Sequence, residues 1–177
     1  AQFRALRAHK DFGRRGGFRG FTVDACASLK TAKCLRYLSR GSRGLNALGD
    51  FRTAPLCPQE NYYICPPVGL IELVVKRLVE AEVCATLVVP NWVGKAWHVF
   101  LRKHAAAALK LPWQRHPATW WDLSEKKAKP HELANRWEFV AFALDLRPGA
   151  PKPTGVQAVL SWKDAQPMAE PWRKLDF

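Results

Sequence analysis

Residues 61–97 read NYYICPPVGLIELVVKRLVEAEVCATLVVPNWVGKAW, and this stretch decides the fold. Its ends, at 62–64 and 86–89, have the apolar character of short strands, and the double proline after the first strand marks a turn. Between the strands, apolar residues recur at helical spacing: Leu70, Ile71, Val74, Val75, Leu78 and Val79. Charged residues four apart mark the other side of this helix: Glu72, Lys76 and Glu80. The stretch therefore predicts one strand–helix–strand unit.

This unit also predicts where a ligand would bind. Two strands joined by one helix are most simply parallel neighbours, so the turn after the first strand lies at the carboxyl edge of the sheet. Open α/β sheets bind ligands at that edge. Four strands are expected in the sheet, and they run through Val23, Ile64, Val88 and Phe142. Their shared edge should then hold Asp24, Pro66 and Asn91.

The strand over 21–25 (FTVDA) ends next to an acid and several small residues, Asp24, Ala25 and Ser28 among them. Small side chains let a ligand approach the backbone, and a carboxylate accepts hydrogen bonds from hydroxyl or amine groups. These residues are therefore candidates for ligand binding. The alternative for Asp24 is a cap on the turn that follows.

The chain has 177 residues, of which 48% are hydrophobic, which is enough for one full core but short for two. We expect a single α/β domain over residues 21–148, with a mostly parallel sheet and helices on both faces. The basic segment 1–20 is expected to be an arm, with a short helix to about Lys10 followed by a flexible stretch. The proline-rich segment 149–177 is expected to be a tail that wraps the domain through Trp162 and Trp172.

The net charge of +13 is unevenly distributed, because the first fifty residues hold eleven Lys and Arg against three Asp and Glu. Such an imbalance favours a polyanionic partner, most often nucleic acid and less often an anionic membrane surface. The alternative is a basic soluble protein with a solvated surface. In the arm, Arg14, Arg15 and Arg19 alternate with Phe12 and Phe18, as in arms that grip phosphates and stack on bases. The same arm fits an organellar transit segment or a linker to an upstream domain.

A second group of cations lies over residues 33–43 (KCLRYLSRGSR), at spacings of three to four. If this segment is helical, Lys33, Arg36, Arg40 and Arg43 form one basic ridge. The ridge and the arm together are the predicted nucleic-acid-binding surface, with little sequence preference.

The five cysteines are an odd number, and none is arranged as CxxC or lies near a His at metal-ligand spacing, so no metal site is expected. Cys65 and Cys84 lie in or beside predicted core strands, where free cysteine behaves as a small hydrophobe. This favours an intracellular, reducing compartment, either nuclear or organellar. No apolar run approaches the roughly 20 residues that span a bilayer, so no membrane insertion is expected.

Two common enzyme chemistries are not indicated. The histidines show no nucleophile-elbow context such as GxSxG. The phosphate-cradling patterns GxGxxG and GxxxxGK[ST] are absent.

Four motifs follow one another along the chain: VDACAS at 23–28, AKCLRYLSR at 32–40, YYICPPVGLI at 62–71 and TLVVPNW at 86–92, with Trp97 after the last. In this order they resemble the Dam-type DNA N6-adenine methyltransferase module, particularly the diverged copy carried by tyrosine-recombinase (DIRS-like) retroelements. The resemblance covers about residues 21–102, and more faintly the strand that begins at Trp137. It implies a Rossmann-like sheet that binds S-adenosylmethionine, here at Asp24, Ala25 and Ser28.

The resemblance also implies a catalytic turn of the form (Asp/Asn)-Pro-Pro-(aromatic). The first residue accepts hydrogen bonds from the exocyclic amine of adenine, and the aromatic ring stacks on the extruded base. The matching residues here are Cys65, Pro66, Pro67 and Val68. A thiol is a poor acceptor and valine has no π face, so both roles are weakened. The family's glycine-rich cofactor loop is also missing after Ala25, and we expect that binding of S-adenosylmethionine is lost.

Two tryptophans in PNWVGKAW, at 90–97, match the family's aromatic pair. Trp97 is expected to anchor its helix in the core. Trp92, in the turn, is the better candidate for contact with a nucleic-acid base.

We therefore expect a nucleic-acid-binding domain of retroelement origin that descends from an adenine methyltransferase and has lost its catalytic chemistry. One alternative is an active S-adenosylmethionine-dependent DNA N6-adenine methyltransferase that uses Cys65 in an unusual way. Another is a structural RNA-binding subunit of a large ribonucleoprotein, such as an organellar ribosome. The sequence leaves the choice between DNA and RNA open.

Overall fold

The computed structural model describes residues 2–41, 44–111, 121–122, 129–130, 138–156 and 159. The helical elements are α1 (Gln2–Ala8), η1 (Arg15–Gly17), η2 (Val68–Leu70), α2 (Ile71–Ala81) and α3 (Ala96–His104). The main strands are β1 (Val23–Ala25), β2 (Arg36–Leu38), β3 (Asn61–Ile64), β4 (Cys84–Pro90), β5 (Ala107–Lys110) and β8 (Phe139–Asp145). Two short strands, β6 (Trp121–Asp122) and β7 (Lys129–Pro130), pair with each other. Most of the predicted C-terminal tail, with Trp162 and Trp172, lies outside the described residues.

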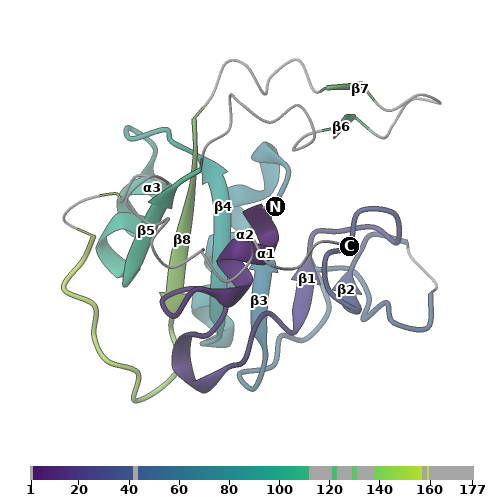
Figure 1. Ribbon diagram of the computed structural model, residues 1–177, viewed down its shortest axis with the longest axis horizontal. Coiled ribbons are helices and arrows are strands. Elements are labelled where there is room, and N and C mark those ends of the chain that lie inside the picture. Colours follow the sequence, from purple (N-terminus) through teal and green to yellow (C-terminus); the bar gives the residue numbers. More distant parts are fainter. Residues whose placement is uncertain are drawn as a thin grey trace, which may run out of the picture.

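The main strands form one mixed sheet of six strands in the order β2-β1-β3-β4-β8-β5 (Figure 1). The strands β1, β2, β3 and β4 are parallel, whereas β8 is antiparallel to both of its neighbours, β4 and β5. The α/β class is confirmed, and so is the single sheet expected to hold Val23, Ile64, Val88 and Phe142. The sheet is mixed because β8 enters between β4 and β5 in the opposite direction.

Both faces of the sheet are covered by other parts of the chain. The first face packs against α2 and α3 through residues such as Leu78 and Leu101. The second face packs against α1, which crosses in front of the sheet in Figure 1, and against the chain that follows α1. Because both faces are covered, β4 and β8 are buried at every position.

Helix α2 follows its apolar spacing closely. Ile71, Val74, Val75 and Leu78 are buried, and Lys76 lies 3.7 Å from Glu80 on the solvent side. Val79, which the spacing predicts on the packed side, is 42% exposed because it lies at the rim of the buried stripe. The helix ends at Glu82, which adopts a left-handed conformation with φ 50°.

The first twenty residues contain the expected short helix, α1, and they also pack against the sheet. Leu6 and Phe12 are each 1% exposed, and they pack on the second face together with Val88 and Leu109. Among the described elements, α1 is the helix that packs on this face, and α1 with the loop after it removes apolar side chains of the face from water. Residues 2–20 are therefore part of the domain.

The basic helix expected over 33–43 is replaced by β2. The backbone of β2 pairs with β1 on one side and with residues 46–49 on the other, where Tyr37 N–H donates to Asn46 O at 3.1 Å. Hydrogen bonds from distant parts of the chain therefore outweigh the local spacing of the cations. The predicted ridge does not form on one helix face, and Arg43 lies outside the described residues.

Candidate functional site

The candidate site lies where the connections of the sheet reverse direction. From β1 the chain proceeds to β2 on one side, whereas β3 and β4 lie on the other side. In open α/β sheets such a reversal leaves a crevice outside the carboxyl ends of the two central strands, and ligands bind there. In this protein the reversal falls between the ends of β1 and β3, at Ala25 and Ile64, which are partners in the register.

Asp24 is the ionisable group at this point. It is 3% exposed, and its Oδ2 accepts a hydrogen bond from the Lys33 N–H at 2.6 Å. Burial raises the pKa of Asp24 from 3.8 to about 7, although the hydrogen bond and the charge of Lys33 act in the opposite direction. A carboxyl group that titrates near neutral pH is typical of functional sites.

The charge of Asp24 acts on three thiols. Burial is the main cause that raises the pKa of Cys26 and Cys34 to about 12, and the charge of Asp24 adds to it. The pKa of Cys65 is raised by the same two causes in the same order. All three cysteines are free. The raised pKa values favour the neutral thiol, which is a weaker nucleophile than the thiolate.

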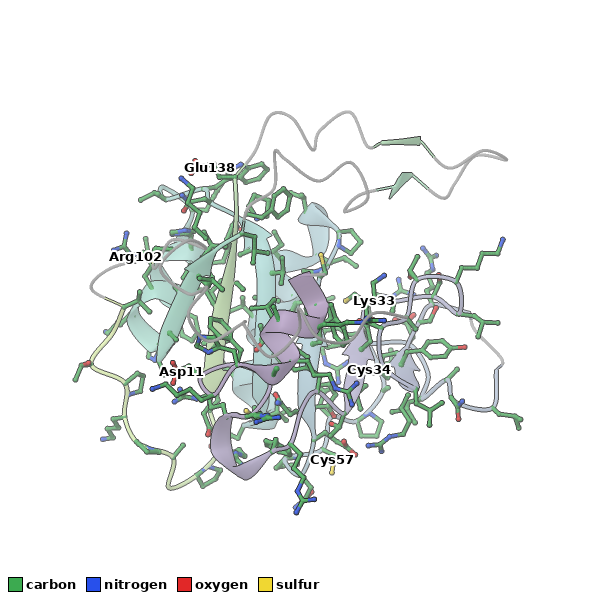
Figure 2. All side chains as sticks on the ribbon, in the orientation of Figure 1. Asp11, Lys33, Cys34, Cys57, Arg102 and Glu138 are labelled. Atoms are coloured by element: carbon green, nitrogen blue, oxygen red, sulfur yellow. The ribbon has the colours of Figure 1, made fainter. Side chains whose placement is uncertain are left out.

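Two of these cysteines were not candidates in the sequence. Cys26 follows β1 with φ 63°, a left-handed conformation that is uncommon for residues other than glycine and that concentrates at functional sites. Cys34 packs with the second-face cluster, and Figure 2 shows it next to Lys33 beside α1. In the sequence, only the position of Cys26 two residues after Asp24 indicates that it belongs to this site. Cys34 is brought towards Asp24 by the fold.

The double-proline turn lies on the other side of the reversal point. Cys65 is half-buried against the second-face cluster, Pro66 is buried, and Pro67 is exposed. The Cys65 sulfur stays protonated, because burial raises its pKa, and a thiol is a weak acceptor. Val68 begins η2 and is 39% exposed, so the position that faces solvent carries an isopropyl group in place of a ring. The fold thus brings Asp24 and the turn to one edge, and the two prolines of the turn are flanked by a thiol and an aliphatic side chain.

The other two candidate cofactor residues make different contacts. Ala25 packs into the cluster on the first face, whereas Asp24, its neighbour in the strand, points to the second face. Ser28 is exposed, and its Oγ lies 3.0 Å from Thr31 Oγ1. Of the three residues, only Asp24 therefore has an unusual environment.

Asn91 connects three elements at the end of β4. Its Oδ1 lies 3.0 Å from Nε2 of His98 in α3, and its Nδ2 donates to Glu138 Oε2 at 3.4 Å just before β8. Glu138 also forms an ion pair with Lys110 of β5, and it lies at the top of the sheet in Figure 2. Burial lowers the pKa of His98, so the imidazole is neutral and donates from Nε2 to the Asn91 oxygen. This hydrogen bond, which the sequence did not indicate, holds the start of α3 at the carboxyl edge.

The two tryptophans occupy different environments beside Asn91. Trp97 is 6% exposed and lies in the first-face cluster, as expected for a core anchor. Trp92 is half-buried, with its ring centroid 6.4 Å from that of Trp97. Part of the Trp92 side chain is therefore accessible at the edge that also carries Asp24 and Pro66.

The predicted phosphate-binding residues differ in how free they are to bind. Arg36 forms two hydrogen bonds of 2.7 Å with Glu60 and is therefore engaged within the domain. Arg15 is half-buried, and its buried Nε has no hydrogen-bond partner within the described part of the chain. The remaining predicted cations in the described residues are exposed, namely Arg14, Arg19, Lys33 and Arg40.

The N-terminal segment carries three further exposed cations that the sequence pattern did not single out. We define the N-terminal basic surface as Arg4, Arg7, Lys10, Arg14 and Arg19, all exposed in the structure. Among the described residues, no ion pair involves any of the five. The only acid in residues 2–20, Asp11, lies 3.8 Å from His9. The second face of the sheet is thus overlaid by positive charge that has no acidic partners in the part of the chain that the structure describes.

Within the described ranges, no group of three or more His, Cys, Asp or Glu side chains is placed to hold a metal ion. The helices of those ranges are too short or too polar to cross a bilayer.

Comparison of the chain with models of known protein families and with curated proteins gives no match.

Proposed function

We propose that this chain is a Rossmann-like domain related to Dam-type DNA N6-adenine methyltransferases, of retroelement origin, that has lost methyl transfer and binds nucleic acid. The observation that carries the binding proposal is the N-terminal basic surface, whose five cations have no acidic partner among the described residues. Cations without partners are free to neutralise phosphates and to release the counterions of a nucleic acid.

Loss of methyl transfer follows from the chemistry of the turn. The exocyclic amine of adenine needs an acceptor that directs it at the methyl group, and the extruded base needs a ring to stack on. The protonated Cys65 and the aliphatic Val68 supply neither. The neighbouring rings do not replace the missing one. Tyr62 packs in the first-face cluster, and the ring centroid of Tyr63 lies 4.9 Å from that of Phe3 on the second face. For every ~1.4 kcal/mol of transition-state stabilisation that is lost with these groups, the rate of methyl transfer falls about tenfold.

Calorimetric titration with S-adenosylmethionine, together with a methylation assay on adenine-containing DNA, tests this loss. We expect no binding heat and no methyl transfer, because the Asp24 carboxyl is buried and already accepts the Lys33 N–H. A double variant, Cys65→Asn with Val68→Tyr, restores the two missing groups and tests their assignment. If the wild type methylates DNA readily and the double variant has no activity, the roles assigned to Cys65 and Val68 are wrong. A wild-type protein that binds the cofactor and methylates DNA would support the active-enzyme alternative instead.

The salt dependence of nucleic-acid affinity tests the binding proposal. In the variant Arg4→Gln, Arg7→Gln, Arg14→Gln, the slope of log affinity against log salt should fall by about 0.7 to 0.9 for each phosphate that is no longer neutralised. The matched control Arg52→Gln, Lys76→Gln, Lys110→Gln has the same net charge but removes cations that pair with Asp50, Glu80 and Glu138. Its slope should equal that of the wild type.

The ligands are single strands and duplexes of one sequence, as DNA and as RNA. Absence of wild-type binding near physiological salt, or equal slopes for the variant and its control, contradicts the proposal. A marked preference for RNA would favour the ribonucleoprotein alternative.

A further inference from the structure

A single side-chain amide ties the N-terminal segment to the sheet. Asn61, at the start of β3, is 0% exposed, and its Nδ2 donates to Gly13 O at 2.8 Å and to Gly20 O at 3.3 Å. Gly13 and Gly20 are the two ends of the loop that carries Arg14 and Arg19. Asn61 therefore closes this loop against a central strand.

A second anchor holds the middle of the same loop. Arg147, just after β8, forms two hydrogen bonds of 2.8 Å with the carboxylate of Asp145. The Arg147 guanidinium also donates to Gly16 O at 3.2 Å and lies over the ring of Phe18, 5.1 Å from its centroid. The Asp145 carboxylate orients the guanidinium, so its contacts with the loop are made from a fixed position.

The close approach at the second anchor requires a glycine. A Cβ on Gly16 would lie 2.0 Å from Arg147 Nη2, and φ at this residue is +62°. The adjacent Gly17 also has a positive φ, +86°, but a Cβ there would meet nothing within 4 Å. The two glycines therefore share a backbone requirement, and only Gly16 is also needed for the approach of Arg147.

We infer that Asn61 and Arg147 are positioning residues for nucleic-acid binding. With Asp145 they form a latch that holds Arg14 and Arg19 in a fixed surface continuous with α1. This inference rests on the proposed function. A surface that is already ordered does not lose the conformational entropy of a free arm when it binds, so the latch raises affinity without touching a phosphate itself.

This role predicts a specific pattern in the binding data. Opening the latch leaves every cation of the N-terminal basic surface in place, so the same phosphates are neutralised and the salt slope should not change. Affinity should fall by about tenfold or more, because the arm must then be ordered on binding. Removal of a cation, in contrast, changes the slope as well.

The test uses three variants: Gly16→Ala, Arg147→Lys and Asn61→Ala, all of which keep the net charge. The matched control is Gly17→Ala, which places the same substitution one residue away in open space. Affinity for single-stranded and duplex DNA is measured over a range of salt, well below the unfolding temperature. Trypsin cleavage after Arg14, Arg15 and Arg19 reports on the loop without any ligand. We expect weaker binding with unchanged slope and faster cleavage in the three variants. The effect of Gly17→Ala should be smaller than that of Gly16→Ala, because the control adds the same backbone strain but leaves the approach of Arg147 open.

Three results would overturn the latch. The first is wild-type affinity and wild-type cleavage in Gly16→Ala and Arg147→Lys. The second is a changed salt slope in those variants, which would mean that the substituted residues touch phosphates directly. The third is an equal fall in affinity in Gly17→Ala. If Asn61→Ala fails to fold, the other two variants decide the matter. If the wild type binds no nucleic acid, the proposed function fails, and the cleavage rates still show whether the latch orders the loop.

Discussion

The buried carboxyl of Asp24 lowers the stability of the domain at neutral pH. Its pKa is about 7 in the folded protein, raised by burial from 3.8. Between these two values the folded state binds more protons than the unfolded state, so the free energy of unfolding falls as pH rises through this window. Within this window each pH unit lowers the free energy of unfolding by about 1.4 kcal/mol. A residue retained at such a cost is typical of a site that serves binding or catalysis, or once did.

Replacing Asp24 with Asn should therefore stabilise the protein. Asn stays neutral at every pH, and its Oδ1 can still accept the Lys33 N–H. Above about pH 7 we expect Asp24→Asn to unfold with a free energy roughly 2 to 4 kcal/mol higher than the wild type. Near pH 4 both side chains are neutral, and the difference should vanish. Urea unfolding of the two proteins at several pH values checks this, and a difference that does not change with pH would contradict it.

At the scale of secondary structure, the end of α2 carries a local cost. Glu82 holds a left-handed conformation, φ 50° and ψ 52°, at the C-cap, where glycine is the common residue. A side chain in this conformation costs about 1 kcal/mol or more. We predict that Glu82→Gly raises the free energy of unfolding by about 0.5 to 1 kcal/mol, after the larger unfolded-state entropy of glycine is counted.

The control for this prediction is Glu82→Ala, which removes the same carboxylate but keeps a Cβ in the left-handed conformation. Alanine should give no gain in thermal unfolding experiments. Equal stabilisation by alanine and glycine would show that the charge of Glu82, and not its backbone conformation, is the source of the cost.

At the scale of the whole molecule, the N-terminal segment completes the second face of the sheet. Leu6 is 1% exposed and packs in the cluster that contains Val88, Leu109 and Phe139. We predict that Leu6→Ala lowers the free energy of unfolding by about 2 to 4 kcal/mol, because it leaves a cavity in this cluster. Leu45→Ala is the matched control, since Leu45 is 106% exposed and its truncation should change stability by less than about 0.5 kcal/mol. Equal, small effects in urea unfolding would mean that residues 2–20 are a free arm after all.

The elements that the sequence predicts well are those whose burial pattern repeats locally. The spacing of Val74, Leu78 and their neighbours predicts α2, and the helix expected around Trp97 is present as α3. The parallel direction of β1, β3 and β4 then places Asp24 and Pro66 at one edge by topology alone, without knowledge of any side-chain contact. The residues on either side of the prolines, Cys65 and Val68, are the sequence basis of the proposed loss of methyl transfer.

The features that the sequence did not predict all depend on partners far away in the chain. Residues 36–38 form β2 because β1 and residues 46–49 supply its hydrogen bonds, although the cations repeat at helical spacing. Arg36 is engaged because Glu60, 24 positions later, lies beside it.

The sequence by itself thus determined the α/β class, the main helices and the edge where the candidate site lies, because these depend on hydrophobic periodicity and on the direction of parallel strands. Only the tertiary structure decided that the basic N-terminal segment is part of the core, and that Asn61 and Arg147 hold it there. The reason is physical: an arginine or an asparagine reads as polar in any sequence, and its role depends on which buried backbone carbonyls the fold brings within hydrogen-bonding distance.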